Sequence, residues 1–303
     1  MSSRLLSIIK GLIISELDNI SQVRYEIGFP LSSIDQIISD RSLGDVRFLK
    51  HHYHDRWFAD PFILNADSNT ISLLVEEYFY SSGKGRIARL TVDRSSFRLI
   101  GNEPVLELST HLSFPFIRRL SGRILIYPES CRSGEWKEYE YNPDSRRIIS
   151  EKTIVVRPFT DATFDHKGRI LTTELPDPNS DSLSVYEFTE GSFSQTDKIV
   201  FEERIARNAG SVFQCGERLF RPAQECNDSY GHSVVIQEVQ DNDGRLFFTE
   251  HCRFSSPHPV LRDGCHTFNV YKDLVVIDVN GPRKPGMKSF FKFVYEHSFI
   301  RSR

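Results

Sequence analysis

Three acidic residues occur at repeated points of this 303-residue chain, and their type suits sugar chemistry. Asp60 precedes Phe62, Asp161 precedes Phe164, and Glu225 ends an apolar run in the next repeat. Cleavage of a glycosidic bond uses one ionised carboxylate and one protonated carboxyl group in a single pocket. We therefore predict that Asp60, Asp161 and Glu225 point into one pocket, where one carboxyl group stays ionised and another is held protonated. A turn-capping role is the ordinary alternative for any one acid taken alone.

Six further polar residues are candidates for contact with a ligand. They are Glu77, His111, Glu129, Arg207, Arg221 and His266. Arginine suits two-pronged contacts with phosphate or carboxylate, and a buried ion pair is an equally good interpretation of both arginines. Five aromatic residues offer faces for a sugar ring, although aromatic residues at repeat positions more often fill a core. They are Trp57, Phe58, Tyr78, Phe114 and Tyr230.

A motif repeated five times must position these residues. Each copy has a small or acidic residue, a Phe, a polar turn and an apolar strand. The anchors are Phe62, Phe116, Phe164, Phe213 and Phe268, with spacings of 54, 48, 49 and 55 residues. Four short strands in about 50 residues are typical of a propeller blade, so the sequence predicts an all-β, five-bladed β-propeller. The anchors should then be equivalent about a five-fold axis. The regular spacing disfavours the alternative, a β-sandwich.

The chain is predicted to divide into three parts. Residues 1–45 form a short helical N-terminal and closure segment, residues 46–282 the propeller, and residues 283–303 a basic aromatic tail. Apolar residues at positions 5, 8, 9, 12 and 13 have helical spacing. The fifth repeat is short of strands, and residues 25–29, 46–49 or 289–295 are candidates to complete it. The innermost strands should line a central channel, so that acids from different repeats converge there.

The run Trp57-Phe58-Ala59-Asp60-Pro61-Phe62 resembles the opening motif of the five-bladed arabinanase, invertase and levansucrase superfamily. This resemblance implies that Asp60, Asp161 and Glu225 act as base or nucleophile, orienting acid and general acid, in that order. Two positions depart from the pattern when the repeats are aligned on their Phe anchors. Phe114 takes the place of Asp60 in the second repeat, and Ala162 takes it in the third. Because a one-residue shift changes the face of a strand, Asp165 is the substitute for Asp161.

A longer series of motifs resembles the N-terminal propeller of glucosamine inositolphosphorylceramide transferases. The series includes Ala59-Asp60-Pro61-Phe62, Glu76-Glu77-Tyr78, Tyr127-Pro128-Glu129-Ser130, Arg207-Asn208-Ala209-Gly210 and His266-Thr267-Phe268-Asn269. The resemblance implies a carbohydrate-active protein that handles a glycan, nucleotide sugar or lipid-linked sugar in surface-polysaccharide or glycolipid biosynthesis, by glycosyl transfer or hydrolysis. A non-catalytic glycan-binding or scaffold module that serves a partner glycosyltransferase is the alternative class.

Composition narrows the remaining choices. With 38 Lys and Arg against 41 Asp and Glu, the chain lacks the basic excess of a nucleic-acid binder. Its five cysteines form no CxxC pair, which predicts reduced thiols and a cytoplasmic protein. The histidine-rich run at residues 51–55 lacks a fourth ligand at zinc spacing, so we predict no metal, and we predict no cofactor. The cations and aromatics of the tail suit peripheral contact with the inner membrane face, with packing on the propeller as the alternative.

Overall fold

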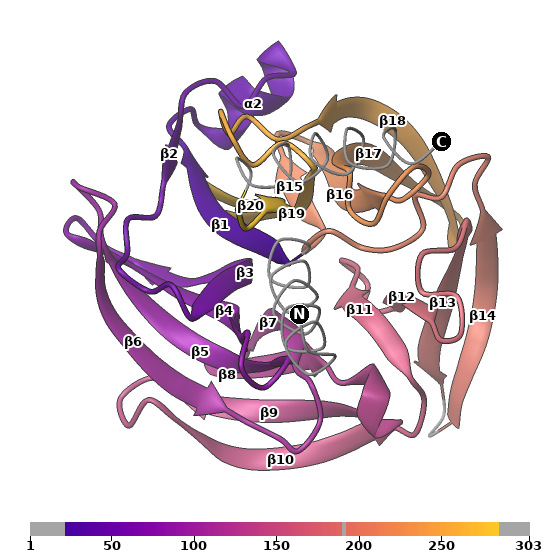
Figure 1. The fold of residues 1–303 in the computed structure, drawn as a ribbon. Coiled ribbons are helices and arrows are strands. Elements are labelled where there is room, and N and C mark those ends of the chain that lie inside the picture. The colour runs from indigo at the N-terminus through magenta and orange to yellow at the C-terminus, as the bar shows by residue number, and fades with distance from the viewer. Residues whose placement is uncertain (1–21, 190–191, 285–303) are drawn as a thin grey trace, which may run out of the picture.

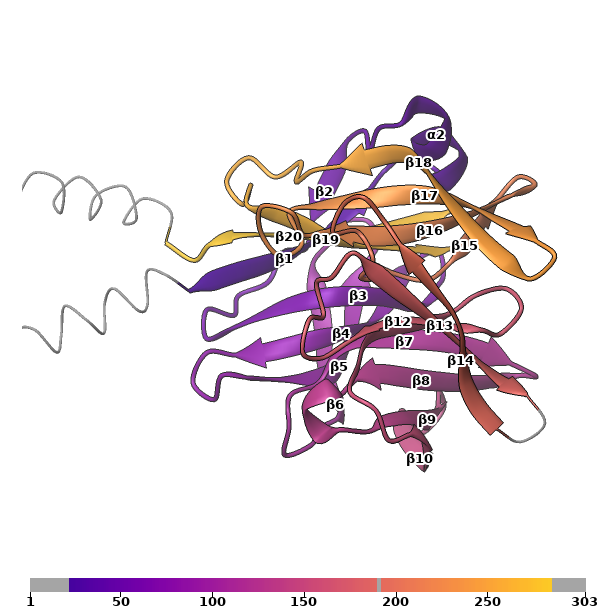
Figure 2. The same cartoon turned by 90° about the vertical axis from the view of Figure 1, so that its right-hand side faces the viewer.

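The protein is a five-bladed β-propeller in the computed structural model, which describes residues 22–189 and 192–284 (Figure 1). Five four-stranded sheets follow one another round a central axis, and all their strand pairs are antiparallel. Figure 2 views the same disc from its edge. The predicted all-β propeller is thereby confirmed.

Four blades follow one another in chain order. The first comprises β3 (Arg56–Ala66), β4 (Thr70–Phe79), β5 (Lys84–Asp93) and β6 (Leu99–Leu106). The second comprises β7 (Ser113–Leu120), β8 (Arg123–Glu129), the 3-10 turn η1 (Cys131–Ser133), β9 (Trp136–Asn142) and β10 (Arg147–Val155). The third comprises β11 (Phe159–Phe164), β12 (Ile170–Glu174), β13 (Ser182–Thr189) and β14 (Ser192–Val200). The fourth comprises β15 (Phe213–Cys215), β16 (Arg218–Glu225), β17 (Ser233–Asn242) and β18 (Arg245–Phe254).

The fifth blade joins the two ends of the described chain. Its inner strands are β19 (Gly264–Tyr271) and β20 (Leu274–Pro282), and its outer strands are β1 (Val23–Pro30) and β2 (Val46–Phe48). Tyr25 pairs with Asn280 and Gly28 with Ile277, so hydrogen bonds between distant parts of the sequence close the ring. Both N-terminal candidates for closure are therefore used, and the propeller begins ahead of residue 46. The third candidate, residues 289–295, lies outside the described residues.

The helix α2 (Ile34–Asp40) lies between β1 and β2 at the rim of the disc (Figure 1). Ser33 caps it, because its Oγ accepts the Gln36 N–H while the Gln36 side chain accepts the Ser33 N–H. The predicted helical N-terminal segment is not supported, since residues 5–13 lie outside the described residues. Residues 285–303 of the predicted basic tail lie outside them as well. In the part of the chain that the structure describes, no helix is long and apolar enough to span a bilayer.

A β-bulge interrupts the inner strand of four blades and decides which side chains face the axis. The flanking pairs are Ala59–Glu76 and Phe62–Leu74, Ser113–Glu129 and Phe116–Tyr127, Thr160–Thr173 and Thr163–Leu171, and Gly264–Asn280 and Thr267–Asp278. In the first three bulges one residue has positive φ, namely Asp60 (50°), Phe114 (43°) and Asp161 (43°). Asp161, and not Ala162, is therefore the counterpart of Asp60.

The register also corrects the predicted equivalence of the Phe anchors. Phe62 and Phe116 directly follow their bulges, whereas Thr163 holds that place in the third blade and Phe164 comes one residue later. Such an offset turns a side chain to the other face of its strand. Phe62 and Phe164 accordingly approach Phe116 from opposite neighbouring blades, with ring centroids 6.1 and 5.9 Å from it.

Candidate functional site

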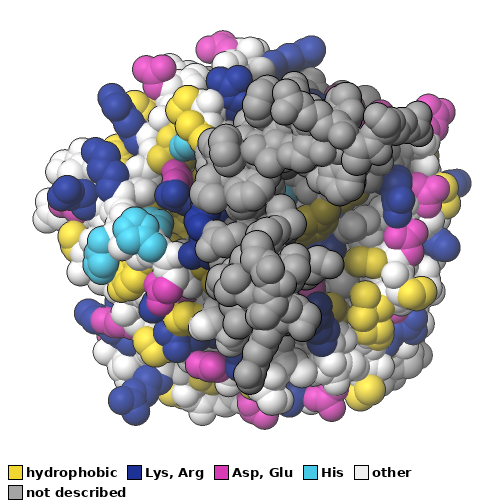
Figure 3. All heavy atoms as spheres, in the orientation of Figure 1, with side chains coloured by type: hydrophobic (Ala, Val, Ile, Leu, Met, Phe, Trp, Pro, Cys, Tyr) yellow, Lys and Arg dark blue, Asp and Glu magenta, His cyan; other side chains and the backbone are white. Residues whose placement is uncertain are grey.

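A pocket of about 320 Å³ lies where the five bulged or inner strands converge at one face of the disc. Each blade contributes to its wall: Asp60, Glu129, Thr160, Arg207 and His266 come from the first to the fifth blade in that order. Figure 3 views the disc in the orientation of Figure 1 and shows basic and acidic side chains interspersed around its rim. The polar side chains that line the pocket converge at the axis, and concave sites with a few convergent polar groups commonly bind ligands.

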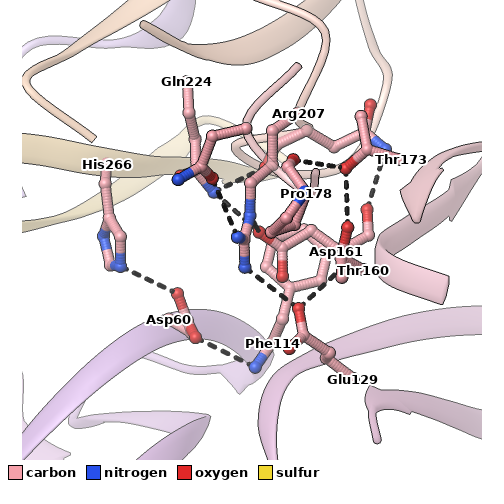
Figure 4. Close-up of polar contacts among 12 residues, drawn as sticks. Asp60, Phe114, Glu129, Thr160, Asp161, Thr173, Pro178, Arg207, Gln224 and His266 are labelled. Atoms are coloured by element: carbon pink, nitrogen blue, oxygen red, sulfur yellow. Dashed lines mark hydrogen bonds and ion pairs between the residues drawn. The ribbon is translucent and has the colours of Figure 1, made fainter. Parts of the chain in front are cut away.

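Asp60 and His266 form an ion pair that links the first and fifth blades. The His266 Nε2 lies 3.5 Å from Asp60 Oδ1 (Figure 4). On the other side of the ring, the Nδ1–H donates to Asp278 Oδ1 at 2.5 Å. Asp60 Oδ2 accepts the Phe114 N–H at 2.9 Å, and the Asp60 N–H donates to Asp278 Oδ2 at 2.8 Å. The bulges therefore aim backbone N–H groups at carboxylates of the preceding blade.

The charges of this group set its protonation. Burial alone would lower the pKa of His266, but the carboxylates of Asp278 and Asp60 outweigh it and raise that pKa to about 9. Burial, with repulsion from Asp278 and Asp161, raises the pKa of Asp60, although His266 opposes the rise. Asp60, His266 and Asp278 are also the one group of metal-type donors found among the described residues, with their ligand atoms all within 4.8 Å. A protonated His266 already balances one carboxylate of this group, and its proton occupies the nitrogen lone pair that a metal would need.

A second network joins the second, third and fourth blades. Arg207 Nε donates to Asp161 Oδ2 at 2.6 Å, and its Nη2 donates to Glu129 Oε2 at 3.0 Å (Figure 4). The same Glu129 oxygen accepts the Asp161 N–H at 3.2 Å, and Gln224 Nε2 donates to Asp161 Oδ2 at 2.7 Å. Burial acts to raise the pKa of Asp161, but Arg207 holds that pKa below its usual value. Burial and the Asp161 charge raise the pKa of Glu129 despite Arg207.

Glu76 is the buried carboxyl group of the pocket with an unused oxygen. It occupies on β4 the register position that Glu129 occupies on β8, and it is 5% exposed. Its Oε1 has no hydrogen-bond partner among the described residues. His111 Nε2 lies 3.3 Å from it outside hydrogen-bond geometry, while His111 Nδ1 accepts the Gly85 N–H. Burial lowers the pKa of His111 to about 4, so the ring is neutral near pH 7 and leaves Glu76 without a counter-charge.

Aromatic rings form the remaining wall. Trp57 and Tyr78 stack with centroids 4.5 Å apart and planes 8° from parallel, and Tyr25 lies 4.7 Å from Trp57. Tyr230 meets His266 edge-on at 5.4 Å and lies 4.9 Å from the Arg207 guanidinium. A pocket with flat apolar faces beside buried hydrogen-bonding groups can hold a ring that carries hydroxyl groups.

The structure brings six of the nine predicted site residues together. Asp60, His111, Glu129, Arg207 and His266 line the pocket, and Asp161 is bonded to Arg207 at its wall. Trp57, Tyr78 and Tyr230 also line it, whereas Phe58 and Phe114 are fully buried in the core.

Glu225 does not line the pocket, contrary to its predicted place opposite Asp60. Its Oε1 accepts the Asn227 N–H at 2.7 Å, and its Oε2 lies 2.9 Å from His232 Nδ1. Successive strand residues face opposite sides, and Gln224 is the β16 residue that points at the acid network.

Two further predicted ligand-binding residues, Glu77 and Arg221, also do not line the pocket. The Glu77 carboxylate is fully buried within the first blade and accepts bonds from Arg56, Arg86 and Asn102. Arg221 is buried in the fourth blade. It donates to the carbonyls of Ile205 and Ala206 and to the side chains of Asn208 and Gln237. Asp165, the substitute for Asp161, pairs with Arg169 away from the pocket. All of these contacts support the fold.

Sequence reasoning missed Glu76, Gln224 and Asp278. Alternation along β4 places Glu76 on the face of Leu74 and Glu77 on the face of Leu73, so it could not by itself choose between the two acids. No signal marked Asp278, because its role depends on the bulge that brings His266 against it.

A family model and curated proteins each match more than half of this chain. Residues 43–250 match the family model described as glucosamine inositolphosphorylceramide transferase 1, N-terminal. The chain is 26% identical over 206 residues to glucosamine inositolphosphorylceramide transferase 1 of Oryza sativa subsp. indica, covering 62% of this chain and 27% of that protein. The Arabidopsis thaliana protein of the same name is 26% identical over 200 residues, covering 61% and 26%. The chain thus spans about a quarter of the length of these curated relatives.

Among solved structures, an exo-β-1,3-galactanase from Phanerochaete chrysosporium matches with a TM-score of 0.49 at 10% identity, covering 64% of this chain and 49% of that chain. The family match includes the residues that build the second to fourth blades of the pocket, Glu129, Asp161 and Arg207 among them. The chain therefore belongs to the family defined by the N-terminal domain of glucosamine inositolphosphorylceramide transferase 1.

Proposed function

We propose that the pocket at the axis, which we call the channel-mouth pocket, binds a sugar unit of a glycan, nucleotide sugar or glycolipid during glycan or glycolipid biosynthesis. The residues that line this pocket include Asp60, Glu76, Glu129, Arg207 and His266. One observation carries the proposal: the stacked Trp57–Tyr78 wall lies in the same pocket as Glu76, whose Oε1 has no partner among the described residues. Sugar rings present apolar C–H faces and hydroxyl edges, and these match an aromatic face and a buried polar oxygen. Family membership supports the proposal, because the name of these relatives, glucosamine inositolphosphorylceramide transferase, includes both a sugar and a ceramide lipid.

The geometry favours binding over hydrolysis by the predicted acid pair Asp60 and Glu225, because Glu225 does not line the pocket. A glycosidase needs a second carboxyl group across the scissile bond from its base. The inward position on β16 holds the Gln224 amide, and Glu225 is turned away from the pocket. Glu129 and Asp161 are both engaged by Arg207. We therefore propose a module that holds a sugar for a partner glycosyltransferase.

Calorimetric titration with nucleotide sugars, glycolipids and free oligosaccharides tests this proposal. We expect one class to bind, and we expect Tyr78→Ala to weaken that binding about tenfold or more through loss of the stacking face. Tyr80→Ala is the matched control, since Tyr80 is on the same hairpin but does not line the pocket. It should change affinity by less than about twofold, within the usual range for a substitution outside a site. Equal losses in both variants, or no binding by any class, would contradict the proposal.

A further inference from the structure

A second pocket, of about 400 Å³, lies at the opposite ends of the strands that line the first. Strand β7 contributes Ser113, its first residue, to the channel-mouth pocket and Arg119, near its end, to this one. Strand β4 contributes Glu76 to the first pocket and Ser72 to the second. Because both strands cross the disc, the two pockets open on opposite faces, and the second lies between the first two blades.

The second pocket has a cationic lining. Arg89, Arg119 and Arg123 contribute to it, and none of the described residues in the lining is acidic. Arg123 pairs with Glu140 at 2.6 Å, and Arg89 lies 3.4 Å from Glu103, so two of the three arginines have acidic neighbours outside the lining. The third arginine leaves a positive charge unbalanced at the pocket.

Arg119 is that third arginine. Its Nη2 donates to the carbonyl oxygens of Ile63 and Leu64 at 2.9 and 2.8 Å, and its guanidinium lies 4.6 Å from the centre of the Tyr271 ring. Within the described ranges no carboxylate forms an ion pair with it. Arg119 as a whole is exposed, and partial burial of its guanidinium lowers its pKa, with Tyr271 opposing the shift. The carbonyl bonds fix the group in place and leave its other N–H donors for a ligand.

Tyr141 supplies a second unused donor. It lines the pocket from the end of β9, is 2% exposed, and its hydroxyl has no hydrogen-bond partner among the described residues. A buried hydroxyl without a partner is destabilising, so such a group usually has a water or ligand as its partner. Burial raises the pKa of this hydroxyl, Arg89 and Arg146 oppose the rise, and Glu103 adds to it. Arg89 also donates to Ser72 Oγ at 3.0 Å. A charged donor, Arg119, and a neutral donor, Tyr141, therefore line the same pocket.

We propose that this second pocket binds a small phosphorylated ligand, with phosphoryl oxygens at Arg119 and Tyr141 and a ring against Tyr271. Guanidinium groups match the geometry of phosphate oxygens, and multiple arginines suit the multiple charges of a phosphate or diphosphate. The volume admits a ligand larger than a free ion. A nucleoside diphosphate and a phosphorylated lipid headgroup share this chemistry. The site is independent of the sugar pocket, because it uses the other face of the disc.

Titration of the full chain with four probes tests the proposal: inorganic pyrophosphate, a nucleoside diphosphate, vesicles that contain phosphatidic acid, and inorganic sulfate. We expect pyrophosphate or one of the two larger phosphoryl probes to bind more tightly than sulfate. Binding by the nucleotide would assign a soluble ligand, and binding by vesicles alone would assign a lipid headgroup. No binding by any probe at millimolar concentration, or equal binding of sulfate and every phosphoryl probe, would overturn the proposal.

Two phenylalanine variants locate the bound probe. Tyr141→Phe should weaken binding about tenfold by removing a hydrogen bond to a charged group, and it should fold normally because the lost hydroxyl has no protein partner. Tyr139→Phe is its match, since Tyr139 is on the same strand and also has an unpartnered buried hydroxyl, but does not line the pocket. It should leave affinity unchanged. Arg119→Gln should abolish binding. Equal affinities for the two phenylalanine variants would overturn the assignment.

Discussion

Replacing Arg207 with methionine is expected to lower the free energy of unfolding by about 3–5 kcal/mol, the usual cost of removing one partner from a buried ion pair. Arg207 bonds Asp161 at 2.6 Å and Glu129 at 3.0 Å, and all three side chains are buried. Without the guanidinium, the ionised Asp161 has to remain charged beside Glu129 or take up a proton. Urea unfolding of the variant at pH 7 measures the loss directly.

Arg204→Met is the matched control for this prediction. Arg204 pairs with Asp177 at 2.8 Å, but the two side chains are 47% and 62% exposed. Exposed pairs contribute about 0–1 kcal/mol, so this variant should unfold close to the wild-type midpoint. If the two variants lost equal stability, the network that joins three blades would contribute no more than a surface contact, and the account of the site would be wrong.

The stability of the wild-type protein is expected to fall as the pH rises from about 6.5 to about 9. Folded His266 holds its proton up to a pKa of about 9, whereas an unfolded histidine releases it near 6.5. The folded state therefore binds more protons between these values. The contribution is complete below about pH 6.5 and is lost as the pH passes about 9. A shift of this size corresponds to on the order of 3 kcal/mol.

Thermal melts of His266→Gln and His52→Gln across this range provide the check. The glutamine that replaces His266 keeps a hydrogen-bonding side chain but has no titrating group, so the slope of stability against pH should become shallower. Asp60 and Glu129, whose pKa values are also raised by burial, account for the slope that remains. His52 is exposed and should leave the wild-type slope in place when it is replaced. A slope as steep in His266→Gln as in the wild-type protein would show that His266 does not contribute to it.

The blade architecture could be predicted from the sequence because it depends on local patterns. Strand-length apolar runs separated by polar turns recur every 48 to 55 residues, and each run forms a strand where it was expected. For the strands that close the ring, only a set of candidate segments could be predicted. The reason is that the pairing of β1 with β20 depends on contacts between residues far apart in the sequence. Both N-terminal candidates fitted the alternation of a strand, and the structure uses both.

Register was the level at which prediction failed. A bulge adds one residue to the inner strand, and nothing in a Phe-anchored alignment shows where that residue enters. Asp161 and Phe114 therefore proved equivalent to Asp60 although the alignment separated Asp161 from both. For the same reason, Glu77 and Glu225 were predicted as site residues, whereas their neighbours Glu76 and Gln224 are the residues that face the site. Arg207 and His266, which were identified by residue type, line the pocket, whereas Arg221, identified in the same way, does not.

Tryptophan fluorescence tests the central claim, that the channel-mouth pocket binds a sugar. The chain has two tryptophans: Trp57 lines the pocket, and Trp136 is 1% exposed in the core. The Trp136→Phe variant therefore reports on Trp57 alone. Titration of this variant with the sugar that binds in calorimetry should produce a saturable change in Trp57 emission with the calorimetric Kd. Calorimetric binding that leaves Trp57 emission unchanged would place the sugar elsewhere and contradict the claim.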